Sequence, residues 1–316
     1  MLRVYDWRLA EAADLDDAFA AEMLRWHDAL HWDAGESWQL VDDACRAGTL
    51  PGFVAVDAGG RIAGWTFFLR SGGALQIGAL NATTAEAGAQ LLDAVLRSPL
   101  AEDAASAIFF GFSTAPDLER LLASRGFGVE RYLYLERETA GLARGPEAAS
   151  WRESRRDALA GLLAGAYDNT QARAFARDGS LDGWREYVSQ LLTTTGCGRF
   201  LPEGCQLLET EDGGLDAAVL ATRIADHTLH LPQVVVAPHA RRRGLAGRLV
   251  SAALAIAADA GFHRATLLVG EHNATGRRLY DKLGFRETAA FVSATLHAGR
   301  GSDESLVPGS SCLVRS

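Results

Sequence analysis

The sequence predicts a chain of the α/β (α+β) class that contains two copies of one arrangement of helices and strands. Alternating apolar runs, typical of strands, are interspersed with segments of helical periodicity in both halves. Three landmarks of the first half recur in the second at a separation of 154 to 158 residues: Gly60 and Gly214, Leu80 and Val236, and Gly126 and Gly284. The 316 residues and the hydrophobic fraction of 48% also suit two globular domains.

The first copy is predicted over residues 1–138. It begins with a strand near Leu2–Trp7, and helical segments follow across Leu15–Ala47. A hairpin is predicted at Phe53–Trp65, because two alternating runs flank a Gly-Gly turn. The remaining elements are predicted to alternate between strand and helix: strand Ala74–Leu80, helix Ala85–Leu96, strand Ala107–Phe112, helix Ala115–Ser124 and strand Val129–Leu135.

The second copy is predicted over residues 149–298, after a linker at 139–148 that contains glycine and proline. We expect it to begin with a strand near Ala149–Glu153, followed by helices through Thr194. The hairpin pattern returns at Cys205–Leu220. Residues 299–316 are rich in glycine and serine and are predicted to form a disordered tail.

The most informative segment is the loop that follows the β-branched run Val234–Val236. Pro238 ends this run, Arg241–Arg243 follow, and an apolar-periodic helix is predicted over Leu249–Ala260. A helix N-terminus carries unpaired N–H groups and the positive end of the macrodipole, so three arginines there indicate a bound anion. The small residues in Gly244–Gly247 would let a phosphate approach the backbone. The loop therefore predicts a pyrophosphate cradle, and the alternative is a solvated basic turn.

A second motif follows a predicted strand at Ala265–Val269. Asn273 suits the N-cap of a helix over Ala274–Leu283. Gly284 stands where a left-handed residue is expected at the end of that helix. A further strand is predicted from Phe285 toward Leu296.

Together the two motifs resemble those of the GNAT family of N-acetyltransferases. Arg241–Ala246 matches the acyl-CoA loop of that family, which has glutamine or arginine first, glycine fourth, and glycine or alanine sixth. Asn273, Tyr280 and Leu283–Phe285 match the family's second motif. The resemblance extends from about Gly198 to Leu296. It implies two tandem GNAT folds, each a mixed, mostly antiparallel sheet flanked by helices, with acetyl-CoA (CoA) as the cofactor.

The resemblance also implies which residues hold the cofactor. Val234 would donate its backbone N–H to the thioester carbonyl, and a fixed donor of this kind stabilises the developing oxyanion. The implied CoA-binding residues are Val234, Val236, Arg241, Arg242, Arg243, Gly244, Leu245, Ala246, Gly247, Asn273 and Arg277. The four cysteines show no metal-ligand spacing, so no metal is expected.

Three side chains are candidate catalytic groups. Tyr280 occupies the family position near the CoA sulfur, where its hydroxyl would protonate the leaving thiolate or its ring would only pack on the cofactor. His230 occupies the position of a general base, and it shares a face with Pro232 and Val234 if the strand alternates. A structural histidine is the alternative. Glu271 is the other candidate base, and a chain of waters is the third route.

The first copy lacks this chemistry. Ala85–Gln90 has no cation where the second copy has its arginines, and Glu86 would repel a phosphate. Leu122 stands where the second copy has Tyr280. We therefore predict a degenerate GNAT-like domain that packs on the active copy and shapes the acceptor site. Candidate acceptor residues are Tyr167–Thr170, Trp184–Tyr187, Trp26, His27, His31, Trp32 and Trp38, with a core position preferred for Trp184.

The leading hypothesis is an acetyl-CoA-dependent N-acetyltransferase that acts on a primary amine, a small molecule, by direct attack in a ternary complex. The net charge of −9 argues against a nucleic-acid partner, and no apolar run has the length of a membrane span. No signal-peptide pattern begins the chain, so we expect a cytoplasmic protein. Two packed copies could replace a homodimer, so either a monomer or a homodimer is expected. The alternatives are a mycothiol-synthase-like enzyme, a protein or peptide acetyltransferase, and a non-catalytic acyl-CoA sensor.

Overall fold

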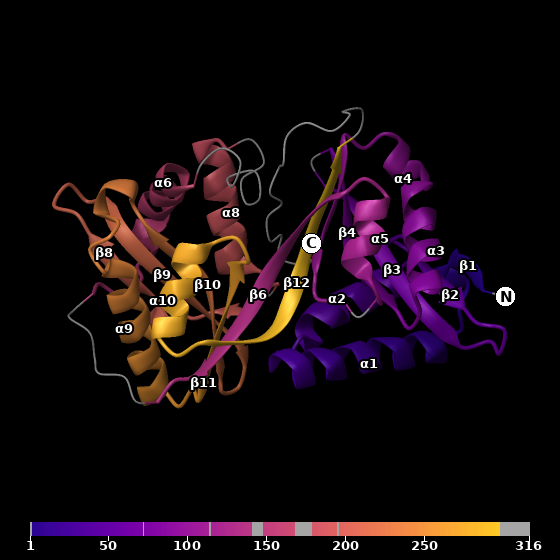
Figure 1. Cartoon of the computed structure of the whole chain (residues 1–316), viewed down its shortest axis with the longest axis horizontal. Helices are drawn as coiled ribbons and strands as arrows, with labels where there is room; N and C mark the ends of the chain where they lie inside the picture. Colours follow the sequence, from indigo (N-terminus) through magenta and orange to yellow (C-terminus); the bar gives the residue numbers. More distant parts are fainter. Residues whose placement is uncertain are drawn as a thin grey trace.

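The computed structural model describes residues 2–71, 73–113, 115–140, 148–167, 179–194 and 196–297. Strands and helices alternate in the first half as the sequence predicts (Figure 1). Its elements are β1 (Arg3–Asp6), α1 (Ala12–Leu30), α2 (Gly35–Arg46), β2 (Gly52–Val56), β3 (Ile62–Ser71), β4 (Ala74–Ala82), α3 (Ala85–Leu96), α4 (Pro99–Glu102), β5 (Ser106–Gly111), α5 (Leu118–Ser124) and β6 (Gly128–Glu138).

The second half follows a similar order but has no described first strand, and it contains the additional short strand β7. Its elements are α6 (Arg156–Ala166), α8 (Leu181–Thr193), β7 (Arg199–Phe200), β8 (Gln206–Glu209), β9 (Leu215–Ala225), β10 (Thr228–Val236), α9 (Leu245–Asp259), β11 (Arg264–Gly270), α10 (Ala274–Lys282) and β12 (Arg286–His297). In the described residues, no helix has the length and apolar character needed to cross a membrane.

The described strands form one sheet of twelve strands. Its order is β1-β2-β3-β4-β5-β12-β6-β11-β10-β9-β7, and β8 pairs with β9 off this path. Only β4 with β5 and β10 with β11 pair in parallel, and the other neighbours are antiparallel. The predicted fold class, mixed and mostly antiparallel with flanking helices, is therefore confirmed.

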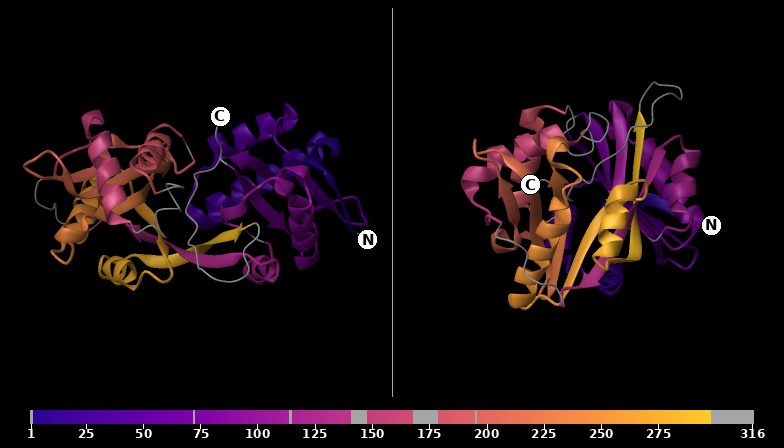
Figure 2. Two further views of the ribbon diagram at one scale, coloured as in Figure 1. Left: turned by 90° about the horizontal axis from the view of Figure 1, so that it is seen from above. Right: turned by 60° about the vertical axis from the view of Figure 1, so that its left-hand side comes forward.

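The two halves exchange their last strands. β6 ends the first half but pairs with β11 of the second, with Tyr132 opposite Gly270. β12 ends the second half but pairs with β5 of the first, with Val292 opposite Gly111. The two exchanged strands also pair with each other, and they run side by side between the halves (Figures 1 and 2). The separate sheets expected from the repeat are thus joined into one.

The two faces of the first-half strands pack on different helices. Val54 and Val56 belong to a core of aromatic side chains from α1 and α2, whereas Ala55 between them packs with residues of α3. This alternation follows from the two-residue period of a strand. The aromatic core reaches the exchanged strands through Tyr134 and Phe291, so α1 and α2 cover a face that continues into the second half.

The strand predicted at Ala149–Glu153 is wrong. Ala149 forms a single β-bridge with Leu207, and Glu153–Arg155 form a turn of 3-10 helix that leads into α6. The turn brings two arginines, Arg152 and Arg155, onto Glu209 at 2.9 Å each, an arrangement that an extended strand would not allow. The linker residues 141–147 and the predicted tail lie outside the described residues.

Candidate active site

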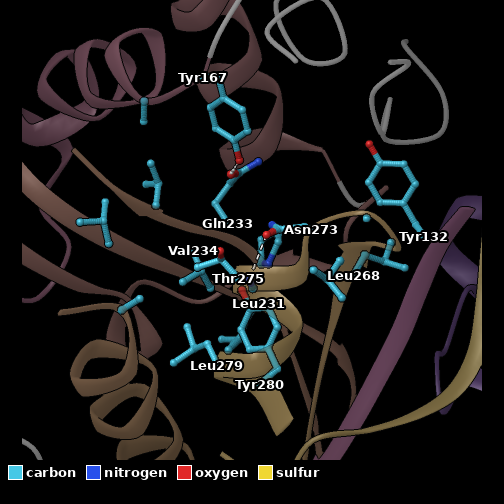
Figure 3. A pocket seen from close by; sticks show the side chains of 18 of the residues that line it. Tyr132, Tyr167, Leu231, Gln233, Val234, Leu268, Asn273, Thr275, Leu279 and Tyr280 are labelled. Carbon is cyan, nitrogen blue, oxygen red and sulfur yellow. Dashed lines mark hydrogen bonds between the residues drawn. The ribbon is translucent and has the colours of Figure 1, made fainter. Parts of the chain in front are cut away.

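A cavity of about 1100 Å³ opens between the two halves of the chain. Its floor is the middle of the sheet, and the loop after β10 and the start of α10 form one end. The second half contributes most of the lining, and the first half adds rings from α1, β5 and β6 and the ring of Trp32, two positions after α1. Figure 3 shows Val234 on β10 and Tyr132 on β6 on either side of Leu268, which lies on the strand between them.

The cavity begins where β10 and β11 diverge. The two strands pair over three residues only: residues 228–230 of β10 lie opposite residues 264–266 of β11. Beyond His230, β10 keeps its partner β9 on one edge, with Val234 opposite Val219, and none of the described strands pairs with its other edge there. Backbone groups on that open edge are therefore available to a ligand, because a buried N–H needs an acceptor.

A β-bulge in β10 changes which residues share a face. The register shifts between His230, opposite Thr222, and Gln233, opposite Leu220. His230 and Gln233 therefore share a face, and the prediction that His230 shares one with Pro232 and Val234 is wrong. Proline cannot donate to a ladder and is commonly found at bulges, which explains the interruption at Pro232.

The predicted cradle is an open helix N-terminus. Gly244 is the N-cap of α9 with a φ of 75°, and it supplies no side chain to the first turn. Arg242 also has a positive φ of 63°, a conformation that disfavours a residue with a side chain. In the described part of the chain, no acceptor is recorded for the backbone N–H groups of residues 242–247. A glycine cap and a row of open donors fit a pyrophosphate.

The three arginines of this loop have different roles. The guanidinium of Arg241 donates to Ala166 O at 2.6 Å and to Val236 O at 3.3 Å, so it fixes the loop against the end of α6. Arg242 lines the cavity, whereas Arg243 does not. Arg277 is also outside the lining and donates to Glu271 O at 3.1 Å. Phosphate binding by Arg243 and Arg277 stays a prediction.

Two further parts of the predicted cradle also support local structure. Asn273 caps α10, and its side chain accepts a hydrogen bond from Gly276 N at 2.9 Å. A Cβ on Gly247 would lie 3.3 Å from Leu279, so this glycine lets α9 and α10 approach. Leu245 is buried beneath the loop, and Ala246 lies at the cavity surface.

The equivalent helix of the first half is closed by its own side chain. Thr84 caps α3, and its hydroxyl accepts from Ala87 N at 3.1 Å. Glu86 lies in the first turn of α3, and Leu122 is fully buried where the second half has Tyr280. The first half therefore lacks both the glycine cap and the phenol, and its lack of CoA binding stays a prediction.

His230 lies between rings of the first half. Its ring centroid is 5.2 Å from that of Trp32, and it stacks at 6.3 Å on Tyr134, with 11° between the planes. The Nδ1 atom lies 2.9 Å from Thr266 Oγ1. Burial lowers the pKa of the imidazole to about 3, so the ring is neutral near pH 7. A ring with so low a pKa is a weak proton acceptor but can accept a hydrogen bond.

The other two candidate catalytic groups differ in burial. Tyr280 is 7% exposed and lines the cavity, and burial raises the pKa of its phenol, so it is a hydrogen-bond donor at neutral pH. Glu271 lies at the open end of the cavity and faces Arg131, with 3.6 Å between oxygen and nitrogen. Because Arg131 competes for its lone pairs, Glu271 is poorly placed as a base.

The acceptor side combines residues that were predicted with others that were not. Tyr167 donates to Gln233 at 2.9 Å, and the Gln233 amide in turn donates to Tyr187 at 2.5 Å (Figure 3). Gln233 was not predicted, because the sequence analysis assumed an alternating strand; Pro232 is the local signal for the bulge that turns Gln233 toward α6 and α8. Trp26 and Trp32 line the cavity. The other predicted residues are placed elsewhere: Trp38 and Trp184 are buried in the cores, His27 and His31 are not in the lining, and residues 168–170 lie outside the described residues.

Comparison with known proteins finds relatives of this half of the chain. The model of the acetyltransferase (GNAT) family matches residues 177–285, which include β10, the open loop, α9 and α10. Residues 177–285 are therefore similar to the GNAT acetyltransferases. An uncharacterized N-acetyltransferase of Bacillus subtilis, YhfO, is 40% identical to this chain over 67 residues, which are 21% of this chain and 45% of YhfO. The match thus covers less than half of that relative.

Solved structures share the architecture of the whole chain. A GCN5-related N-acetyltransferase from Sphaerobacter thermophilus has a TM-score of 0.65 at 16% identity, covering 97% of this chain and 98% of its own. A tandem GNAT protein from the clavulanic acid biosynthesis pathway has a TM-score of 0.58 at 16% identity, covering 96% of this chain and all of its own. The tandem layout is therefore a known arrangement of this fold.

Proposed function

We propose that the chain is an N-acetyltransferase that transfers the acetyl group of acetyl-CoA to a primary amine of a small molecule. The observation that carries the proposal is the open N-terminus of α9, which has a glycine cap and leads directly into the gap between β10 and β11. The first half has an equivalent helix that its own threonine closes. An unpaired helix start next to a divided sheet suits a pyrophosphate followed by an extended thioester.

The residues around the gap have separate tasks in this proposal. Acetyl-CoA supplies the acetyl group as a thioester, and transfer to the amine forms a C–N bond as the C–S bond breaks. Val234, on the open edge of β10, donates its N–H to the carbonyl oxygen as negative charge develops there. Tyr280 donates a hydrogen bond to the departing sulfur and supplies its proton.

The amine must present its lone pair, and His230 orients it. Thr266 also donates to Leu229 O at 3.3 Å, so its oxygen accepts from Nδ1–H of the imidazole. This leaves Nε2 of His230 as an acceptor for an N–H of the amine. Because the low pKa keeps the imidazole neutral, the proton lost by the amine passes to solvent through the open cavity.

Calorimetric titration of acetyl-CoA tests the cofactor site. We expect one site per chain, and we expect Arg242→Glu to weaken binding at least tenfold, roughly the effect of reversing a charge beside a phosphate. Arg97→Glu is the matched control, because Arg97 is exposed at the end of α3 in the first half. Two sites, or equal loss in both variants, would contradict the assignment. A screen of amines for release of free thiol then tests the transfer.

A further inference from the structure

The cavity continues beyond the acyl-transfer centre into a chamber built from the exchanged strands. On the face of β6 that carries Tyr134, alternate residues bring Tyr132 and Glu130 to the same side. Phe291 of β12 lies opposite Tyr132, and Phe110 of β5 lies one strand further along the sheet. Tyr134 is buried beneath the cavity. The other four side chains line it: Phe110, Glu130, Tyr132 and Phe291.

The walls of this chamber are aromatic. The ring of Phe110 lies 5.7 Å from Tyr132 and 5.7 Å from Phe291, and Trp26 lies 6.0 Å from Phe291. The edges and faces of such rings pack on apolar groups and attract cations. The chamber therefore suits a ligand with an apolar body. The ionisable groups beside the rings decide which ligand charge the chamber prefers.

Within the described residues, Glu130 makes no hydrogen bond and no ion pair with an arginine or lysine. His272 and Tyr132 interact with it electrostatically, and His272 favours the charged form of its carboxyl group. Partial burial raises the pKa of Glu130, which reflects the cost of holding its charge there. The other carboxylate of the lining, Glu271, already faces Arg131. A ligand cation at Glu130 would offset this cost.

The position of Glu130 excludes it as the anchor of the reacting amine. Glu130 lies four positions before Tyr134, which stacks on His230, and four steps of an extended strand span about 13 Å. A cation held at Glu130 therefore lies at the far end of a ligand whose other end reaches the acyl-transfer centre.

We propose that the acceptor is an extended primary amine with an apolar body and a second positive charge at its distal end, and that Glu130 binds this second charge. The inference rests on the proposed acetyl transfer for the identity of the reacting end. The first half of the chain, although it lacks a cofactor cradle, thus selects the acceptor through residues of β5 and β6.

Binding of matched amines tests the inference without any need for turnover. 1,8-Diaminooctane and octylamine have the same apolar body and differ in the distal charge. By calorimetry without acetyl-CoA, we expect the diamine to bind the full chain roughly tenfold more tightly, and we expect Glu130→Gln to abolish this preference. Glu102→Gln is the control, because this substitution removes the same charge from an exposed position on α4.

Each outcome separates this inference from the acetyl transfer. A preference that survives in Glu130→Gln, or none in the unmodified chain, overturns the role of Glu130. A preference that disappears in Glu130→Gln, while no amine is ever acetylated, supports the binding site and contradicts the proposed activity. If Glu130→Gln fails to fold, raising the salt concentration applies the same test to the unmodified chain, where loss of the preference supports an ionic anchor and its persistence overturns it.

Discussion

Replacement of His230 by glutamine should change how stability depends on pH. The imidazole is neutral in the folded chain down to about pH 3, whereas its ordinary pKa is 6.5. Below that ordinary value the unfolded chain binds a proton that the folded chain does not, so stability falls as the pH falls. Below the ordinary pKa, each pH unit lowers the free energy of unfolding by at most about 1.4 kcal/mol. Lowering the pH from neutral to about 5 should therefore reduce this free energy by about 2 kcal/mol through His230.

Urea unfolding at about pH 7.5 and about pH 5 measures this cost. The unmodified chain should lose about 2 kcal/mol more than His230→Gln between the two conditions, because the other titrating groups contribute equally to both. His297→Gln is the matched control, since His297 is exposed at the end of β12. An equal loss in all three proteins would refute a buried, neutral imidazole, and with it the role of His230 as a fixed hydrogen-bond acceptor.

Two further substitutions test the site and its framework. Tyr280→Phe should lower kcat at least tenfold and change KM for acetyl-CoA by less than about threefold, because the ring still packs while the proton donor is lost; an unchanged kcat would exclude Tyr280 as the acid. Gly247→Val should lower stability in thermal unfolding by about 1 to 3 kcal/mol, because the valine side chain would press on Leu279. Gly165→Ala is the control and should be neutral or stabilising, because nothing lies within 4 Å of the added Cβ. Equal melting temperatures for these two variants would contradict the close packing of α9 on α10.

Local chemistry predicted the ends of elements well. Asn273 caps α10 through its own side chain, and Gly284 has the expected left-handed conformation with a φ of 81°. Both follow from requirements of a few neighbouring residues, which a sequence displays directly. The loop after β10 was predictable for the same reason, since its glycines and arginines are contiguous.

Pairing between distant strands was not predictable in this way. β6 and β12 have similar apolar patterns, so nothing local distinguishes pairing with their own half from pairing with the other. The choice depends on packing across the molecule, such as the hydrogen bond of 2.7 Å from Tyr134 to Leu30 O. Glu130 was missed for this reason, because a strand exchange brings it into the cavity.

The strand exchange has a consequence for synthesis of the protein. β5 obtains its antiparallel neighbour only from Arg286–His297, the last described strand of the chain. While the ribosome is still making the second half, the first half therefore has an unpaired edge on β5, and such edges are prone to association with other chains. Termination of the chain before Arg286 would remove the whole of β12 from the middle of the sheet. Premature termination should thus affect the earliest part of the molecule as severely as the latest.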